Sequence, residues 1–203
     1  GRDRERIGLS LIQTIELRIG GSGALIEAEL VNLSNKHVDD YEQHWQPCLQ
    51  GFSQDDQDLS WRFKKQLATR QANHEGYAVE YDGMTQGMML IETQYHWSMF
   101  TPGQRLVYIE TVVSAPWNRI YIQRPPRIKG VGRELLEFAR QRSRALGYNG
   151  CIGLHSLPGA VQFYERLGMM HLELEPEEIL DADEDVPYFE YMGQPQEQEN
   201  RDE

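Results

Sequence analysis

The segment from Val131 to Leu146 constrains the fold most, because its apolar residues repeat at helical spacing. Val131, Leu135 and Ala139 lie at i, i+4 and i+8, which is typical of one buried helix face. Gly147 is a natural stop for this helix. The preceding apolar stretch, Arg105 to Ser114, predicts a central strand that is buried on both faces. A strand followed by an amphipathic helix indicates a mixed α/β domain.

The rest of the chain predicts mainly strands, with helices near the start and after the central strand. Glycine-containing turns separate the strands, at 20–23 and at Asp82-Gly83. We expect further strands at 9–19, 24–33, 76–81, 86–97, 150–155, 169–174 and 186–192. We expect helices at 36–49, capped by Ser34-Asn35, at 56–71, with Leu59, Phe63 and Leu67 on one face, and at 158–168, between Pro158 and Gly168. The predicted fold is a mixed, mostly antiparallel central sheet flanked by helices, with an N-terminal hairpin extension.

The composition fits one globular domain, which we place at 1–192, followed by a polar tail at 193–203 that we expect to be disordered. The 203 residues are 39% hydrophobic and 26% charged. No apolar run is long enough for a membrane span, so we expect a soluble protein without a membrane partner. Cys48 and Cys151 are too few for a disulfide framework, which favours a reducing, cytoplasmic location. A net charge of −12 argues against nucleic acid as a partner.

Basic residues gather where a loop becomes the 131–146 helix. Arg124, Arg127, Lys129 and Arg133 alternate there with Gly130 and Gly132. Glycines let a ligand approach the backbone, and the first N–H groups of a helix attract anions. The pattern predicts an anion site that suits a pyrophosphate.

Two motifs in sequence order give the chain a family resemblance. Residues 127–132, Arg-Ile-Lys-Gly-Val-Gly, match Arg/Gln-x-x-Gly-x-Gly/Ala, and residues 164–169, Tyr-Glu-Arg-Leu-Gly-Met, match Tyr-Glu-x-x-Gly-Phe/Met. With the strand before each motif, the chain resembles the GNAT superfamily of N-acetyltransferases over about residues 105–175. The resemblance implies a single enzyme reaction: transfer of an acetyl group from acetyl-CoA to a primary amine of a small molecule or protein.

The resemblance also implies roles for individual residues. Tyr164 would protonate the leaving thiolate, and the strand end would pair with the pantetheine arm and polarise the thioester. The residues expected to bind acetyl-CoA are Val112, Val113, Arg127, Ile128, Lys129, Gly130, Val131, Gly132 and Arg133. Leu157 stands where many relatives carry a cofactor-binding asparagine.

An attacking amine needs a base, because a free alkylamine has a pKa of about 10.4. Glu110 is the candidate base, since it is a carboxylate within an apolar strand. Glu80 and Glu92 are weaker candidates of the same kind, and Glu80, Trp117 and His155 are candidate substrate contacts. Structural roles remain open for all of them: an ion-paired Glu110, a core Tyr164 and a hydrogen-bonded His155.

A cluster of acidic residues suggests what kind of acceptor the protein would bind. The segment 175–185 contains Glu175, Glu177, Glu178, Asp181, Asp183, Glu184 and Asp185. Such a loop would attract a cationic acceptor, or it would simply be a solvated loop. The long stretch 115–126 would be a lid, line the acceptor site or be peripheral.

A metal site would need more ligands than the sequence places close together. His37 and His44 lack a third ligand nearby, so we expect no metal. A catalytically silent CoA-binding regulatory module, an interaction domain and a homodimer all remain compatible with the sequence.

Overall fold

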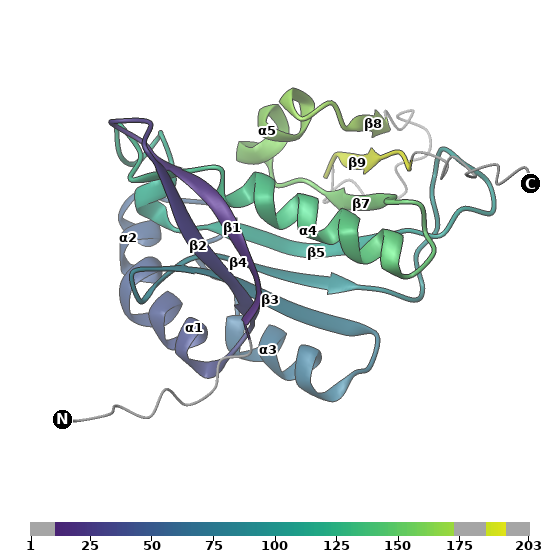
Figure 1. The fold of residues 1–203 in the computed structure, drawn as a ribbon, viewed down its shortest axis with the longest axis horizontal. Helices are drawn as coiled ribbons and strands as arrows, with labels where there is room; N and C mark the ends of the chain where they lie inside the picture. The colour runs from purple at the N-terminus through teal and green to yellow at the C-terminus, as the bar shows by residue number, and fades with distance from the viewer. Residues whose placement is uncertain (1–10, 173–185, 194–203) are drawn as a thin grey trace, which may run out of the picture. The chain divides into compact units, whose positions relative to one another are not determined.

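The computed structural model describes residues 11–172 and 186–193 (Figure 1). Two compact units divide the described chain. One contains residues 11–91 and 111–137, and the other contains 92–110, 138–172 and 186–193. The acidic segment 175–185 and the tail at 194–203 lie outside the described residues, as do the first two residues of the predicted strand 9–19. The prediction of one domain over 1–192 remains a prediction.

The first unit contains the N-terminal strands and the first helices. Its strand order is β6-β1-β2-β3-β4, followed by the second half of β5. The pairings β6–β1, β1–β2 and β2–β3 are antiparallel. The strands are β1 (Leu11–Ile19), β2 (Leu25–Asn32), β3 (His74–Tyr81), β4 (Met84–Glu92), β5 (Val107–Ser114) and β6 (Ile128–Lys129). The helices are α1 (Asn35–Asp40), a π-helical turn (Tyr41–Trp45), α2 (Gln46–Gly51), α3 (Trp61–Arg70) and a 3-10 turn (Pro116–Asn118).

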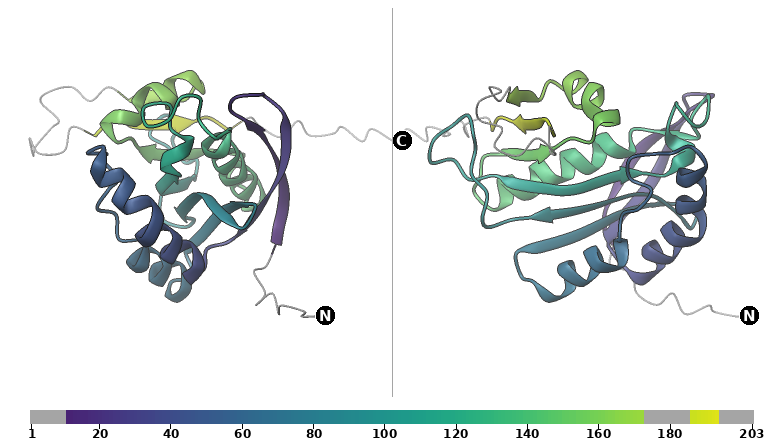
Figure 2. Two further views of the ribbon diagram at one scale, coloured as in Figure 1. Left: turned by 90° about the vertical axis from the view of Figure 1, so that its left-hand side faces the viewer. Right: turned by 180° about the vertical axis from the view of Figure 1, so that it is seen from behind.

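Two layers of helix pack on the strands of this unit. Helices α1, α2 and α3 lie on one side of β3 and β4 (Figure 2), where Trp45, Trp61 and Met88 share a buried cluster. On the other face of β4, Gly87 lies against the start of helix α4 (Val131–Ala145). Neighbouring strand residues point to opposite faces, so Gly87 faces α4 and Met88 faces the layer formed by α1, α2 and α3.

The second unit contains the first half of β5 and the last strands. Its strand order is β5-β7-β9-β8. Strand β7 runs parallel to β5, whereas β9 is antiparallel to β7 and β8. Its other elements are β7 (Ile152–His155), a 3-10 turn (Pro158–Ala160), α5 (Val161–Arg166), β8 (Met170–Leu172) and β9 (Tyr188–Tyr191). Strand β5 and helix α4 each continue from one unit into the other.

The main features of the prediction are confirmed. The structure is mixed α/β, with largely antiparallel strands and flanking helices. Val131, Leu135 and Ala139 are all buried. The segments 20–23 and Asp82-Gly83 both form hairpin turns. No helix among the described residues is long and apolar enough to cross a membrane.

Two predicted boundaries were wrong. The helix expected at 56–71 begins at Trp61, because the Ser60 side chain accepts the Phe63 N–H as an N-cap. This start turns Phe63 outward, with 58% of its surface exposed, and buries Trp61 instead. The strand expected at 86–97 ends at Glu92, whose carboxylate accepts the N–H groups of Gln94 and Tyr95 and so turns the chain.

The expectation that β5 is buried on both faces was also wrong. Val107, Ile109 and Val113 are buried, whereas Tyr108, Glu110 and Val112 are half-buried. Alternate residues of a strand share a face, so Tyr108, Glu110 and Val112 form a partly accessible row along β5.

We predict that Gly87→Ala destabilises the protein by about 1–3 kcal/mol. An added Cβ would lie 2.4 Å from Val131 Cγ1 and 3.0 Å from Leu135 Cδ1, so α4 would have to move away from β4. Urea unfolding measures the change. Gly51→Ala is the matched control, since no atom lies within 4 Å of its Cβ, and its effect should stay within about 1 kcal/mol. Equal stability of the two variants would contradict the close packing.

Candidate active site

The basic loop is held from its outer side by the N-terminal hairpin. Strand β6 pairs with β1, with Lys129 opposite Arg18 and Ile128 opposite Ile19. The Gly20 N–H donates to the Arg127 carbonyl at 2.9 Å. A Cβ on Gly20 would lie 1.6 Å from the Pro126 carbonyl oxygen, so only glycine allows this approach. The hairpin therefore fixes the position of the loop.

The loop is held from its inner side by the 3-10 turn. The Arg127 N–H donates to the Trp117 carbonyl at 2.9 Å, and the Ile128 N–H donates to Asn118 Oδ1 at 3.0 Å. The Arg127 guanidinium also lies over the Trp117 ring, 5.5 Å from its centre. These contacts fix the backbone immediately before the helix.

The chain turns into α4 at Gly130. Gly130 has a φ of 99°, a value that favours glycine, and its carbonyl accepts the Glu134 N–H. The next N–H groups lie in the first turn of the helix, where intrahelical partners do not exist. The side chains of Arg127, Lys129 and Arg133 are exposed around this turn. The arrangement can bind a pyrophosphate through N–H groups and positive charge.

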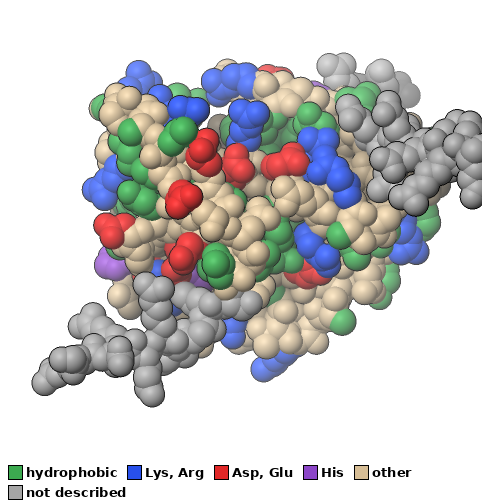
Figure 3. All heavy atoms as spheres, in the orientation of Figure 1, with side chains coloured by type: hydrophobic (Ala, Val, Ile, Leu, Met, Phe, Trp, Pro, Cys, Tyr) green, Lys and Arg blue, Asp and Glu red, His purple; other side chains and the backbone are tan. Residues whose placement is uncertain are grey.

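Acidic side chains are also exposed near this positively charged loop. Glu16 and Glu27 are exposed on the β1–β2 hairpin, and Figure 3 shows acidic side chains lying among basic ones on this face. Burial raises the pKa of Glu134 in the first turn of α4, although the neighbouring Arg133 opposes the change.

A small hollow adjoins the loop in the first unit. Its volume is about 250 Å³, just below the usual range for ligand pockets. Its lining comes from the end of β1, the β3–β4 hairpin, the 3-10 turn and the basic loop: Ile19, Tyr81, Asp82, Met84, Gln86, Trp117, Arg127 and Ile128.

The stretch 115–126 begins as part of the first unit's core. Trp117 Nε1 donates to Gln86 Oε1 at 3.0 Å, and its ring meets Trp45 edge-on at 6.1 Å. Arg119 pairs with the buried Asp56 through both terminal guanidinium nitrogens, at 2.7 and 2.5 Å. Farther along, Tyr121 is exposed. Trp117 is therefore a packing residue that also lines the hollow.

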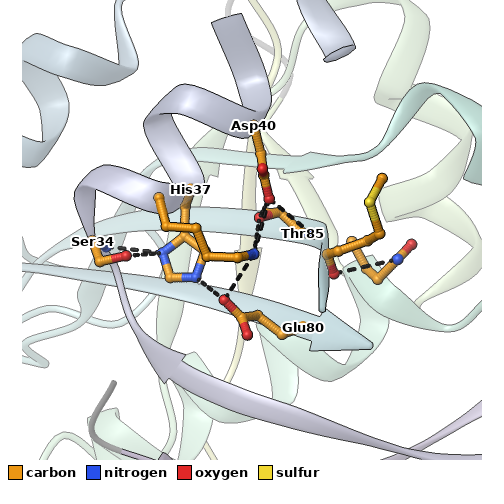
Figure 4. A network of polar contacts seen from close by, with 8 residues as sticks. Ser34, His37, Asp40, Glu80 and Thr85 are labelled. Atoms are coloured by element: carbon orange, nitrogen blue, oxygen red, sulfur yellow. Dashed lines mark hydrogen bonds and ion pairs between the residues drawn. The ribbon is translucent and has the colours of Figure 1, made fainter. Parts of the chain in front are cut away.

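Glu80 belongs to a closed network beneath α1 (Figure 4). The Ser34 N–H donates to His37 Nδ1 at 2.8 Å, so the ring hydrogen lies on Nε2 and is donated to Glu80 Oε1 at 2.7 Å. Lys36 Nζ lies 3.1 Å from the same oxygen. The hydrogen bond from His37, together with Lys36, lowers the pKa of Glu80 despite burial. This carboxylate is already occupied by protein partners.

Tyr164 lies on α5 in the second unit and is 5% exposed. Its ring packs between Phe163 and Phe189, with centroid distances of 5.2 and 5.6 Å. Burial raises its pKa, so the phenol keeps its proton at neutral pH. A neutral phenol can act as a general acid.

His155 and Glu110 lie in the second unit beside a residue that the sequence interpretation missed. The hydroxyl of Tyr108 lies 2.7 Å from His155 Nδ1, and the Tyr108 ring stacks on His96 at 4.1 Å. Glu110 is half-buried on the same face of β5, and its charge contributes to a raised pKa of Tyr108. Strand alternation from Glu110 would have pointed to Tyr108, but no sequence signal pairs Tyr108 with His155 or His96.

The remaining titratable candidates are Glu92, which has structural partners, and the histidines His37 and His44, which differ in exposure. Glu92 is 3% exposed and accepts His96 Nδ1 at 2.7 Å as well as two backbone N–H groups. His37 is buried, whereas His44 is exposed. In the part of the chain that the structure describes, no three His, Cys, Asp or Glu side chains are grouped to hold a metal ion.

The first unit contains Val112, Val113, Trp117, the loop 127–133 and Glu80. Glu110, His155 and Tyr164 belong to the second unit. Leu157, which is 42% exposed, precedes the 3-10 turn of that unit.

Comparisons with known proteins agree with this architecture. A sequence profile described as the acetyltransferase (GNAT) family matches residues 35–169. The chain belongs to this family, whose membership and fold support acetyl transfer from acetyl-CoA as the general reaction. A comparison with curated proteins gave no match.

Solved structures show the same fold at low sequence identity. The GNAT domain of S. lividans PAT is 14% identical, with a TM-score of 0.57, over 88% of this chain and 95% of that chain. An acetyltransferase from Streptococcus agalactiae is 14% identical, with a TM-score of 0.53, over 80% and 96%. The PaiA N-acetyltransferase from Thermoplasma acidophilum, in complex with coenzyme A, is 11% identical, with a TM-score of 0.51, over 81% and 98%.

We predict that Glu80→Gln lowers the free energy of unfolding by about 1–3 kcal/mol at pH 7. The folded-state pKa of Glu80 is lowered from 4.5, so its stabilisation is present above that pH and is lost as the pH falls through the folded value. The difference between wild type and variant should therefore shrink in acid.

Urea unfolding between pH 3 and pH 7 measures this dependence. Glu27→Gln is the control, because Glu27 is exposed on β2, and its effect should stay within about 0.5 kcal/mol. A Glu80→Gln effect that does not change with pH would contradict the lowered pKa.

Proposed function

We propose that this protein is an N-acetyltransferase that transfers the acetyl group of acetyl-CoA to a primary amine by direct attack. The observation that carries the proposal is the anchored loop 127–133, with a positive φ at Gly130 and three exposed basic side chains at a helix start. Family membership supports the choice of acetyl-CoA as the donor.

Acetyl-CoA would be bound by groups at the end of β5 and around the start of α4. The pyrophosphate would lie on the N–H groups of Val131, Gly132 and Arg133, neutralised by Arg127 and Lys129. The backbone of Val112 and Val113, at the end of β5, would pair with the pantetheine arm and polarise the thioester carbonyl. Acetyl-CoA supplies the activated acyl carbon.

The protein's own side chains would manage the protons. Tyr164 holds a neutral phenol and would protonate the departing thiolate. Glu110 would attract the acceptor's ammonium group or take its proton. Glu80 is a weaker candidate, since His37 and Lys36 already occupy its carboxylate. The acidic residues of 175–185 would favour a cationic acceptor.

The two free cysteines fit a reducing compartment such as the cytoplasm.

We predict that Arg127→Glu combined with Arg133→Glu weakens acetyl-CoA binding at least tenfold in calorimetric titration. Both side chains are exposed, and the backbone hydrogen bonds that hold the loop do not involve them. The variant should therefore fold, while two positive charges beside the pyrophosphate become negative. Arg70→Glu, on exposed surface of α3, is the control and should bind as wild type does.

Turnover separates the enzyme from a silent CoA-binding module. Release of free CoA thiol is measured with wild type and a panel of primary amines, and Tyr164→Phe should lower kcat about 100-fold. Binding without turnover would support the silent module, and the absence of binding would overturn the donor site.

We predict that Gly20→Ala also weakens acetyl-CoA binding, although Gly20 lies in the turn after β1 and not in the basic loop. Its Cβ would collide with the Pro126 carbonyl at 1.6 Å and displace the loop. Gly21→Ala is the matched control, since its Cβ would lie at an ordinary 3.5 Å from Pro125. If both variants bind acetyl-CoA equally well, the hairpin does not position the loop.

A further inference from the structure

The hollow beside the basic loop is a small pocket whose lining lies entirely within the first unit. Its volume of about 250 Å³ is too small for most drug-sized ligands and suits a smaller molecule. The proposed acetyl transfer uses one residue of this lining, Arg127. The other lining residues have no part in that reaction, so the hollow can bind a ligand of its own.

Apolar side chains supply much of the lining. Ile19, Tyr81, Met84 and Trp117 are only half-buried, so they leave apolar surface accessible beside the buried Ile128. A ligand that covers this surface removes it from water, which favours binding. The hollow therefore prefers a ligand with an apolar part.

Gln86 adds a hydrogen-bond donor to this apolar lining. The residue is 4% exposed, and its Oε1 accepts Trp117 Nε1 and Asn118 Nδ2, both at 3.0 Å. These two donors fix the orientation of the amide. Among the described residues, Nε2 has one acceptor, the Met84 carbonyl at the long distance of 3.4 Å. Since a side-chain amide carries two N–H groups, one of them is left for an acceptor oxygen of a ligand.

Two opposite charges also line the hollow, and they do not neutralise each other. Asp82 lies in the β3–β4 turn and Arg127 in the basic loop, and both are exposed. Neither residue forms an ion pair with the other, or with any other residue that the structure describes. The Arg127 guanidinium lies 5.5 Å from the centre of the Trp117 ring, which places it beside the apolar lining. A carboxylate and a guanidinium that line one hollow without pairing are complementary to a ligand that carries both charges.

We propose that this hollow binds a free α-amino acid with an apolar side chain. The carboxylate of the ligand would bind Arg127 and accept the remaining N–H of Gln86. Its ammonium group would be attracted by Asp82, and its side chain would lie against Trp117 and Met84. A carboxylate alone would meet the negative charge of Asp82, and an amine alone would meet the positive charge of Arg127. The inference does not depend on the proposed acetyl transfer.

Calorimetric titration of the full chain with three related probes tests the need for both charges. L-Phenylalanine carries both charges, phenylpropionate lacks the ammonium group, and phenethylamine lacks the carboxylate. We expect L-phenylalanine to bind with a Kd of about 1 mM or lower, and each of the other two to bind at least about fivefold more weakly.

Two variants separate the contributions of the two charges. Asp82→Asn removes the negative charge and keeps a residue type that tolerates the φ of 52° at this position. It should weaken L-phenylalanine binding about fivefold, without weakening phenylpropionate. Arg127→Met removes the positive charge and keeps an unbranched side chain, so it should weaken L-phenylalanine and phenylpropionate but not phenethylamine. Asp58→Asn is the matched control, because Asp58 is exposed and does not line the hollow, and it should bind as wild type does.

NMR of the tryptophan indole N–H groups reports where the ligand binds. The Trp117 signal should shift when L-phenylalanine is added, because its hydrogen-bond acceptor, Gln86, also contacts the ligand. The signal of the exposed Trp97, which belongs to the second unit, should not shift. A shift of Trp97 without a shift of Trp117 would overturn the site.

The titrations can also overturn the proposal. It fails if neither L-phenylalanine nor L-leucine binds at about 10 mM, or if phenethylamine or phenylpropionate binds as tightly as L-phenylalanine. Equal affinities of Asp82→Asn and Asp58→Asn for L-phenylalanine would also contradict it. None of these measurements needs acetyl-CoA or turnover, so failure of the proposed function and failure of this site are distinguishable.

Discussion

The candidate donor site depends on the close packing of one helix start between two parts of the first unit. Gly87 lets Val131 and Leu135 of α4 approach β4 without intervening side-chain atoms. On the other side, pairing of β6 with β1 and the contact of Gly20 with Pro126 fix the loop before the helix. Because protein interiors are close-packed, adding even one methyl group at either glycine would displace the loop. The N–H groups of the first turn are thereby held in place before any ligand arrives.

The alternation of β5 gives one strand a buried face and a half-buried face. Val107, Ile109 and Val113 are buried in the protein interior, whereas Tyr108, Glu110 and Val112 form an accessible row. A strand rises about 3.3 Å per residue, so alternate side chains follow one another at about 6–7 Å. The rigidity of the buried side supports the chemistry proposed for the other.

Local environment gives two of the candidate carboxylates structural partners. Glu80 is surrounded by His37 and Lys36, and Glu92 accepts two N–H groups and a histidine. Buried carboxylates of this kind contribute by satisfying donors and are costly to disturb. Glu110 is half-buried on β5, and it is the carboxylate that we propose for the amine. The sequence shows three similar glutamates within strands, and only their neighbours tell them apart.

The sequence by itself determined the order of the elements, the helix at 131–145, the turns at the glycines and the family to which the chain belongs. These features depend on residues close together in the chain, where period, caps and motif spacing carry the information. It gave no sign that the N-terminal hairpin would support the basic loop, that Glu80 would meet His37, or that Tyr108 would meet His155. Only the tertiary structure decided these, because each joins residues far apart in the sequence through strand register and packing.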